Sequence, residues 1–144
     1  MKMISRLSVF ILSVFFLAAC QPEVDQSNEN VEESKTTVGM LQHIVYFYLN
    51  EDVTEEEKAD FEEGLQKLLS IDEVYFYQIG TPGETAERDV TDHSFGYSIS
   101  SWFQTMDDYK VYAEHPIHLE FIDEYSHLWA DVKVFDSEVI VEAN

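Results

Sequence analysis

The apolar residues of this chain recur in patterns that predict alternating strands and helices. Residues 40–50, MLQHIVYFYLN, are rich in β-branched and aromatic residues and are apolar on both alternating faces, which is typical of a strand covered on both sides. Residues 54–71 instead predict an amphipathic helix, with an apolar stripe at Phe61, Leu65, Leu68 and Leu69. Its start carries the spacing of a capping box, Thr54 followed by Glu57.

The next segments predict two further strands joined by a long polar loop. Residues 73–80 form a strand closed by Gly80, and residues 81–92 contain turn residues. Residues 93–103 predict a strand with two unlike faces. The bulky face holds His93, Phe95, Tyr97 and Ile99, and the small face holds Ser94, Gly96, Ser98 and Ser100. The small face would let another surface pack closely against it.

The last part of the chain predicts a helix that is broken by a proline. Thr105 and Asp108 repeat the capping spacing, and this helix ends near His115 because Pro116 disfavours helical geometry in the residue before it. Pro116 in turn suits the first turn of a following helix. In that helix one inward stripe is expected, formed by His118, Ile122, Tyr125 and Trp129. Residues 131–141 supply a final strand.

The order is therefore βαββαβ with a split second helix, which predicts an α+β domain with a ferredoxin-like sheet and helices on one face. Such a sheet has two apolar faces but helices for only one of them. A second copy of the domain is the simplest cover for the other face.

The amino terminus predicts export. Lys2 and Arg6 precede an apolar run, Leu7 to Ala19, so residues 1–19 read as a signal peptide. Thirteen helical residues span only ~20 Å, which is too short for a membrane span. Residues 20–38 are polar and acidic and predict a disordered tether, and residues 39–144 hold enough aromatic density for one compact domain.

The sequence LAAC before this tether resembles the lipobox of bacterial lipoproteins. The resemblance implies that Cys20 is lipidated and holds the protein at the periplasmic or extracytoplasmic side of the cell envelope. The alternative is that Cys20 is incidental. Because Cys20 is the only cysteine, a lipidated Cys20 leaves no thiol for a disulfide, a metal or a nucleophile.

The charge of the chain excludes one class of partner. Eight basic residues stand against 29 acidic ones, a net charge of −21, so the surface would repel phosphates and we expect no nucleic acid partner. The sequence contains no glycine-rich phosphate loop, no cysteine pair and no H-E-x-x-H motif. We therefore expect no cofactor and no metal.

Short motifs in the expected order resemble the stress-responsive A/B barrel domain, or Dabb family. They are HIV in the first strand, TEEE at the helix start, DH in the third strand, Y..HP.H..F at the helix break, then LW and V..FD, and together they cover residues 40–137. Family members are dimeric α+β barrels, so the resemblance implies a homodimer in which two sheets meet face to face.

The resemblance also implies candidate site residues. A plant polyketide cyclase of this family uses a histidine base and a tyrosine without metal or cofactor, and these positions correspond to His118 and Tyr112. Imidazole titrates near neutral pH, and a phenol can hold an enolate oxygen. His43 and His93 are candidate residues of the same cavity, with Tyr97 and His115 as further ligand-binding candidates. Each of these side chains could equally be structural, and His115 could cap the second half of the broken helix.

Three functions remain open at this stage. The first is a lipid-anchored, stress-related homodimer that binds a small apolar or aromatic molecule. The second is a cofactor-independent enzyme, cyclase-like or monooxygenase-like, that uses His118 and Tyr112. The third is a filled barrel with a purely structural role. An open apolar cavity that reaches His118 and Tyr112 favours the first two over the third.

Overall fold

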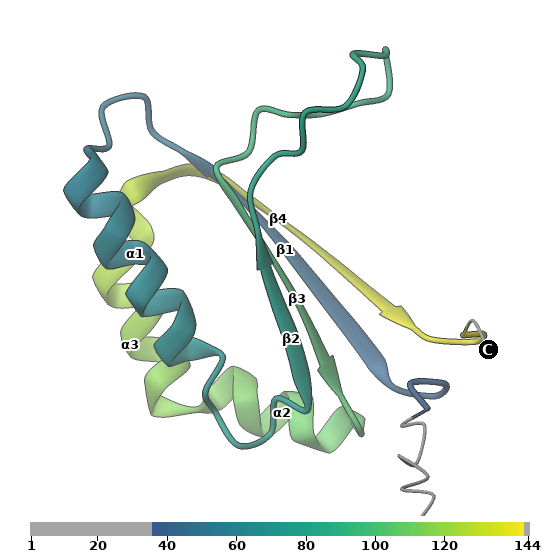
Figure 1. Ribbon diagram of the computed structural model, residues 1–144. Coiled ribbons are helices and arrows are strands. Elements are labelled where there is room, and N and C mark those ends of the chain that lie inside the picture. The colour runs from purple at the N-terminus through teal and green to yellow at the C-terminus, as the bar shows by residue number, and fades with distance from the viewer. Residues whose placement is uncertain (1–35, 143–144) are drawn as a thin grey trace, which may run out of the picture. The chain divides into compact units, whose positions relative to one another are not determined.

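The computed structural model describes residues 36–142. Its elements in chain order are β1 (Leu41–Leu49), α1 (Glu55–Leu68), β2 (Phe76–Gly80), β3 (Tyr97–Phe103), α2 (Met106–Glu114), α3 (Pro116–Tyr125), the 3-10 turn η1 (Ser126–Leu128) and β4 (Trp129–Glu138). The strands form one antiparallel sheet in the order β2-β3-β1-β4. The helices lie on one side of this sheet (Figure 1). The predicted ferredoxin-like α+β fold is confirmed.

Helix α1 forms where the apolar stripe and the capping signal coincide. The Thr54 hydroxyl accepts a hydrogen bond from the Glu57 backbone, and the Glu57 carboxylate accepts one from the Thr54 backbone. Glutamates in the first turn suit the positive end of the helix dipole. All four predicted stripe residues are buried: Phe61, Leu65, Leu68 and Leu69. The stripe fixes the helix against the sheet.

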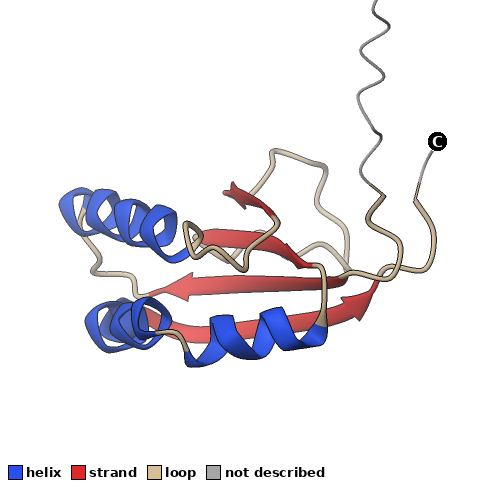
Figure 2. Cartoon of the chain, turned by 90° about the horizontal axis from the view of Figure 1, so that it is seen from below, coloured by secondary structure: helices blue, strands red, loops and turns tan. Residues whose placement is uncertain are grey.

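The second helix is split at the proline, as predicted. Helix α2 ends at Glu114, His115 is extended with a ψ of 138°, and Pro116 starts α3. The Nδ1 atom of His115 accepts a hydrogen bond from the Ile117 backbone at 3.2 Å, so His115 caps α3. Figure 2 shows α2 and α3 running in different directions after this break. The break places the side chains of both helices over the same part of the sheet.

The sheet separates two sets of side chains. The inner face, toward the helices, includes the buried residues His43, Val45 and Phe47 of β1. The outer face carries Ile44, Tyr46 and Tyr48 from the same strand. Neighbouring strands add Phe76, Ser98, Ser100, Trp102 and Phe135 to it, because these residues pair in register with or next to the outer residues of β1. Both faces are apolar, as the sequence predicted.

The prediction for the start of β3 is wrong. The strand begins at Tyr97 rather than at His93. Both the backbone and the hydroxyl of Ser94 donate hydrogen bonds to the Asp92 carboxylate, and this local turn competes with strand pairing. The alternation is broken at Gly96, so Phe95 lies on the outer face, 4.9 Å from the Tyr46 ring, while Tyr97 lies on the inner face.

The prediction for Trp129 is also wrong. Helix α3 ends at Tyr125, η1 follows, and Trp129 is the first residue of β4. The predicted helical stripe therefore stops at Tyr125, and within it Ile122 is 43% exposed while Phe121 is buried instead. Trp129 still packs inward, with its ring centroid 5.3 Å from that of Phe47, because the 3-10 turn returns the chain to the inner face of the sheet.

The predicted leader, Cys20 and most of the predicted tether lie outside the described residues. Of the tether, Thr37 is described, and its backbone donates a hydrogen bond to the Glu142 carboxylate at 2.6 Å. Within residues 36–142 no helix is long and apolar enough to cross a bilayer.

Candidate functional site

A cavity of about 350 Å³ lies between the helices and the inner face of the sheet. Its volume lies within the range usual for small-molecule sites. Its wall is largely apolar, and its polar side chains are two histidines and two tyrosines. The lining residues are His43, Val45, Phe47, Leu68, Ile99, Tyr109, Tyr112, His118, Phe121, Ile122, Trp129, Val132 and Val134. The cavity reaches His118 and Tyr112, as both ligand-dependent hypotheses require.

His43 enters this cavity from the centre of the sheet. It is 6% exposed, and its Nδ1 atom lies 2.6 Å from Oδ1 of Asp136, its register partner on β4. The ring centroid of Tyr109 is 5.4 Å away, and that of Tyr112 is 6.1 Å away. Because Asp136 occupies Nδ1, proton exchange with a bound molecule would use the other nitrogen of His43.

His118 enters from the first turns of α3, and its ring centroid lies 4.8 Å from that of Tyr112. Burial lowers the pKa of His118, the nearby His43 lowers it further, and a hydrogen bond with the Ala113 backbone opposes the shift. The ring is therefore neutral at pH 7. Its Nδ1 atom is buried and has no hydrogen-bond partner. A buried polar atom without a partner is rare, and because this atom is closed to solvent, a molecule in the cavity could reach it only if the ring moved.

Tyr112 lies at the bottom of the cavity and is 1% exposed. Burial raises the pKa of its hydroxyl well above the ordinary range. The phenol therefore keeps its proton at neutral pH and can donate a hydrogen bond. The structure thus brings together three of the predicted site residues, His43, Tyr112 and His118.

The other three predicted site residues do not line this cavity. His93 lies in the loop before β3, where its Nε2 atom is 3.0 Å from the Thr85 hydroxyl, because the strand starts later than expected. His115 is used as the helix cap. Tyr97 lies on the inner face nearer to β2 and donates a hydrogen bond to Glu62 at 2.7 Å.

Sequence reasoning assigned no role to Asp136 or to Tyr109. Asp136 meets His43 only through the register of β1 with β4, and a register across 93 residues of chain cannot be read from one sequence. The one available signal was the aspartate of the V..FD motif. Among residues 36–142, no group of three or more histidine, cysteine, aspartate or glutamate side chains converges as a metal site would require.

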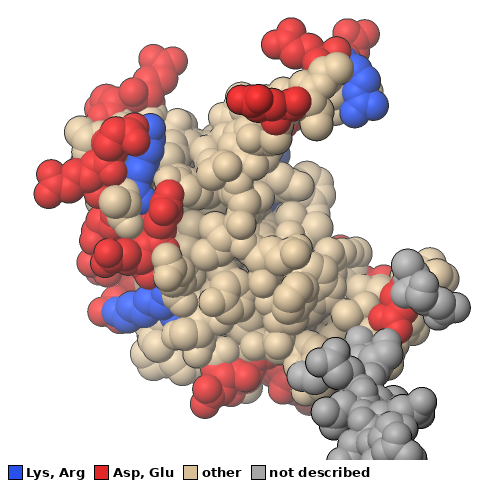
Figure 3. All heavy atoms as spheres, viewed as in Figure 1, with Lys and Arg blue, Asp and Glu red and all other residues tan. Residues whose placement is uncertain are grey.

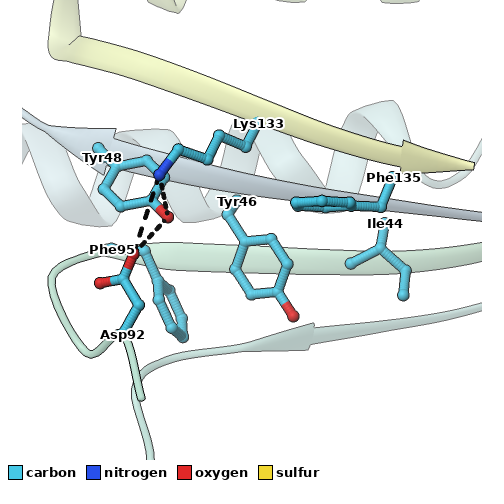
Figure 4. Close-up of a pocket in the computed structure, with 7 residues that line it drawn as sticks. All are labelled: Ile44, Tyr46, Tyr48, Asp92, Phe95, Lys133 and Phe135. Carbon is cyan, nitrogen blue, oxygen red and sulfur yellow. Dashed lines mark hydrogen bonds and ion pairs between the residues drawn. The ribbon is translucent and has the colours of Figure 1, made fainter. Parts of the chain in front are cut away.

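A second hollow, of about 510 Å³, lies on the outer face of the sheet. Its polar wall is a chain of contacts: the Lys133 ammonium donates to the Tyr48 hydroxyl at 3.2 Å, and that hydroxyl donates to Asp92 at 2.9 Å (Figure 4). Hydrogen bonds from Ser94 and Tyr48 hold the pKa of Asp92 at about 2. The remaining lining residues are Ile44, Tyr46, Phe95 and Phe135.

Acidic side chains gather away from the centre of the sheet. Figure 3 shows them over α1 and on the projecting loop between β2 and β3, whereas the middle of this view carries neither acidic nor basic side chains.

Comparison with known proteins gives one family and one fold. The sequence profile described as the Stress responsive A/B Barrel Domain, Dabb, matches residues 41–139. No curated protein is similar enough to the sequence to be matched.

Several solved structures share the fold. A dimeric protein of unknown function with a ferredoxin-like fold from Bacteroides fragilis is 28% identical, with a TM-score of 0.56 over 72% of this chain and 99% of its own. A dimeric ferredoxin-like protein of unknown function from Thermobifida fusca is 19% identical, with a TM-score of 0.59 over 74% and 96%. The hydroxynitrile lyase of Passiflora edulis is 18% identical, with a TM-score of 0.61 over 76% and 98%.

Proposed function

The chain belongs to the stress-responsive A/B barrel domain family, and on that premise we propose that it is a homodimer that binds one small, uncharged, apolar or aromatic molecule in the inner cavity of each subunit. The observation that carries the proposal is the cavity itself, which has apolar walls and a group of neighbouring polar side chains, His43, Tyr109, Tyr112 and His118. An apolar pocket with a few convergent polar groups is the usual form of a small-molecule site. The dimeric relatives support the homodimer.

The charge of the ligand follows from the polar groups around it. Among the described residues that line the cavity there is no lysine or arginine, and the lowered pKa leaves His118 neutral. Asp136 is acidic and already paired with His43. A buried anion would therefore find no opposite charge, which makes its desolvation costly. A neutral molecule with a hydroxyl or carbonyl group could instead form hydrogen bonds with the neutral imidazole of His118 or with the hydroxyl of Tyr112.

We expect the protein to bind naphthol and to reject naphthoate at pH 7. The two probes share a ring system and differ in charge, so shape alone cannot separate them. We expect naphthoate to bind at least about tenfold more weakly, a difference of about 1.4 kcal/mol. Isothermal titration calorimetry with the purified protein measures both affinities, and equal affinities would contradict the proposed ligand class.

Two tryptophan variants on one helix locate the binding site. Ile122 lines the cavity and is 43% exposed, whereas Leu119, also on α3, is 54% exposed and does not line it. Ile122→Trp should therefore fill the cavity and abolish naphthol binding, while Leu119→Trp should leave it unchanged. Loss of binding in both variants, or in neither, would place the probe elsewhere.

A second candidate function, catalysis, is favoured by the neutral protonation state of the His118 imidazole. A neutral imidazole beside a protonated phenol is a suitable base and hydrogen-bond donor. His118 would take a proton from a weakly acidic group of the bound molecule, and Tyr112 would stabilise the oxygen on which charge develops. The proton would then return to the product, so no other reactant is consumed. The lyase from Passiflora edulis supports this candidate only through its shared fold.

Turnover separates catalysis from binding. With mandelonitrile as the probe, the enzyme hypothesis requires that His118 take the hydroxyl proton, that the C–CN bond break to give benzaldehyde, and that the proton pass to the leaving cyanide. The release of benzaldehyde is followed by its absorbance. His118→Ala and Tyr112→Phe should both slow this reaction. Unchanged activity in both variants would rule out this mechanism. If the wild type does not turn over mandelonitrile at all, binding without catalysis of this probe remains.

The location of the protein is part of the same proposal. The LAAC sequence before the acidic tether supports lipidation of Cys20 and attachment to the cell envelope on its periplasmic or extracytoplasmic side. Cells that express the full chain should hold it in their membrane fraction, and Cys20→Ser should release it. A membrane-bound Cys20→Ser variant would contradict attachment through this residue.

A further inference from the structure

The outer face of the sheet carries two features of opposite shape. One is an aromatic ridge, formed by Phe76 and Trp102, whose ring centroids lie 4.9 Å apart. Phe76 is 46% exposed, so a large apolar side chain of the ridge reaches solvent. The other is the hollow of about 510 Å³ around Tyr46 and Phe135. Large apolar side chains exposed beside one another on a soluble domain usually mark an interaction site.

The ridge and the hollow lie diagonally across this face. Trp102 pairs with Gln42, near the start of β1, and Phe76 of the edge strand β2 pairs with Trp102. The hollow lies nearer the end of β1 and extends over the other edge strand, β4, because Tyr46 pairs with Lys133. Ridge and hollow thus occupy different ends and different edges of one sheet.

Between the ridge and the hollow, the outer face carries small side chains. Ser98 and Ser100 of β3 stand opposite Tyr46 and Ile44 of β1, and Gly80 of β2 stands opposite Ser98. The sequence predicted that this row of small residues lets another surface approach closely. The low middle would allow a ridge on the other surface to reach the hollow without a clash.

From this arrangement we propose that, in the homodimer, the Phe76 and Trp102 ridge of each subunit docks into the outer-face hollow of its partner. The inference rests on the proposed homodimer and specifies its register, that is, how the two outer faces are aligned on each other. In a two-fold dimer the same patch on both subunits must be self-complementary. A two-fold axis that lies between the two sheets, perpendicular to the line from ridge to hollow and through its midpoint, brings each ridge over the hollow of the other copy.

The charges of the face agree with this pairing. Docking would remove Lys133 from water, and a buried charge needs a partner. Tyr48 and Asp92 already supply one, since Lys133 lies 3.2 Å from the Tyr48 hydroxyl and 3.9 Å from the Asp92 carboxylate. Helix α1, which carries many acidic side chains, lies on the opposite side of the sheet, so two negatively charged subunits can meet here while these helices remain apart.

A charge-exchange experiment on the full chain tests the register. Phe76→Lys alters the ridge, and Phe135→Glu alters the hollow. Each change occurs twice in a symmetric dimer and buries two unpaired charges, so each variant alone should dimerise at least about tenfold more weakly than the wild type. An equal mixture should recover a heterodimer, because one altered ridge then meets one altered hollow of opposite charge and the second contact is native. With one variant of each mixture uniformly labelled with ¹⁵N, native mass spectrometry separates the homodimers and the heterodimer by mass.

Matched mixtures give the controls. Phe76→Glu with Phe135→Lys should recover in the same way, whereas Phe76→Lys with Phe135→Lys should not. Val111→Lys is a control for added charge, because Val111 is 50% exposed on α2, on the helix side of the sheet. It should stay dimeric. Since Phe76 and Phe135 are both about half exposed in one subunit, circular dichroism should show that all variants fold.

The outcomes of these experiments distinguish the ridge-in-hollow register from the proposed homodimer on which it rests. A dimeric wild type whose opposite-charge mixtures fail to recover would overturn the ridge-in-hollow register and leave the homodimer intact. A wild type that is monomeric at micromolar concentration would overturn both. A small molecule or an unrelated protein retained in the hollow by the wild type would also overturn the register.

Discussion

Replacing Phe61 by alanine is expected to lower the free energy of unfolding by about 3–5 kcal/mol, the range for truncation of a fully buried aromatic side chain. Phe61 is 0% exposed on α1. Its ring contacts five others, with centroids 5.3 to 6.0 Å away: Phe47, Tyr97, Phe121, Tyr125 and Trp129. These residues come from the sheet and from α3, so alanine would leave a void where three elements meet.

Urea denaturation followed by circular dichroism measures this loss. Because the proposed homodimer makes stability depend on concentration, wild type and variant must be compared at one protein concentration. Leu119→Ala is the matched control, because Leu119 is 54% exposed on α3, and it should change the stability by less than about 0.5 kcal/mol. Equal effects of the two variants would mean that Phe61 is not the centre of the core.

Local signals in the sequence were sufficient to predict most of the elements. The α1 stripe, both capping boxes and the helix break at Pro116 each depend on residues within a few positions of one another, and each is confirmed. The strand boundaries were less accurate. At the start of β3 a hydrogen-bonded turn at Asp92 replaces strand pairing, and alternating residue size gives no sign of such a turn.

The candidate site was predicted only in part, because some of its contacts join residues that are far apart in the sequence. His118 and Tyr112 lie on either side of one proline, so the sequence itself indicates that they are neighbours. His43 and Asp136 are joined by strand register. The outer hollow depends on Lys133, Tyr48 and Asp92, which come from two strands and a loop. Contacts of this kind form only when the strands have assembled into the sheet. They include the polar side chains that distinguish a ligand site from a filled core.

The close approach of α1 and α3 gives the second large effect. A Cβ atom built on Gly64 of α1 would lie nearest to Cε2 of Tyr125, and only 2.6 Å from its Cζ atom. Gly64→Val adds two further methyl groups at that point. In an exposed helix the loss of a glycine would be favourable, but here we expect a loss of about 3 kcal/mol, at the upper end of typical overpacking.

A double-mutant cycle identifies the cause of this loss. Tyr125→Ala opens the space beside Gly64, so the loss in the double variant should be smaller than the sum of the two single losses, with a coupling of about 0.5–3 kcal/mol. Gly83→Val is the control, because the nearest atom to its Cβ would be 4.0 Å away on Thr85. Leu68 of α1 and Phe121 of α3 both line the inner cavity, so forcing these helices apart should also weaken naphthol binding. Weakened stability with unchanged naphthol binding would mean that the spacing of the two helices does not set the shape of the cavity.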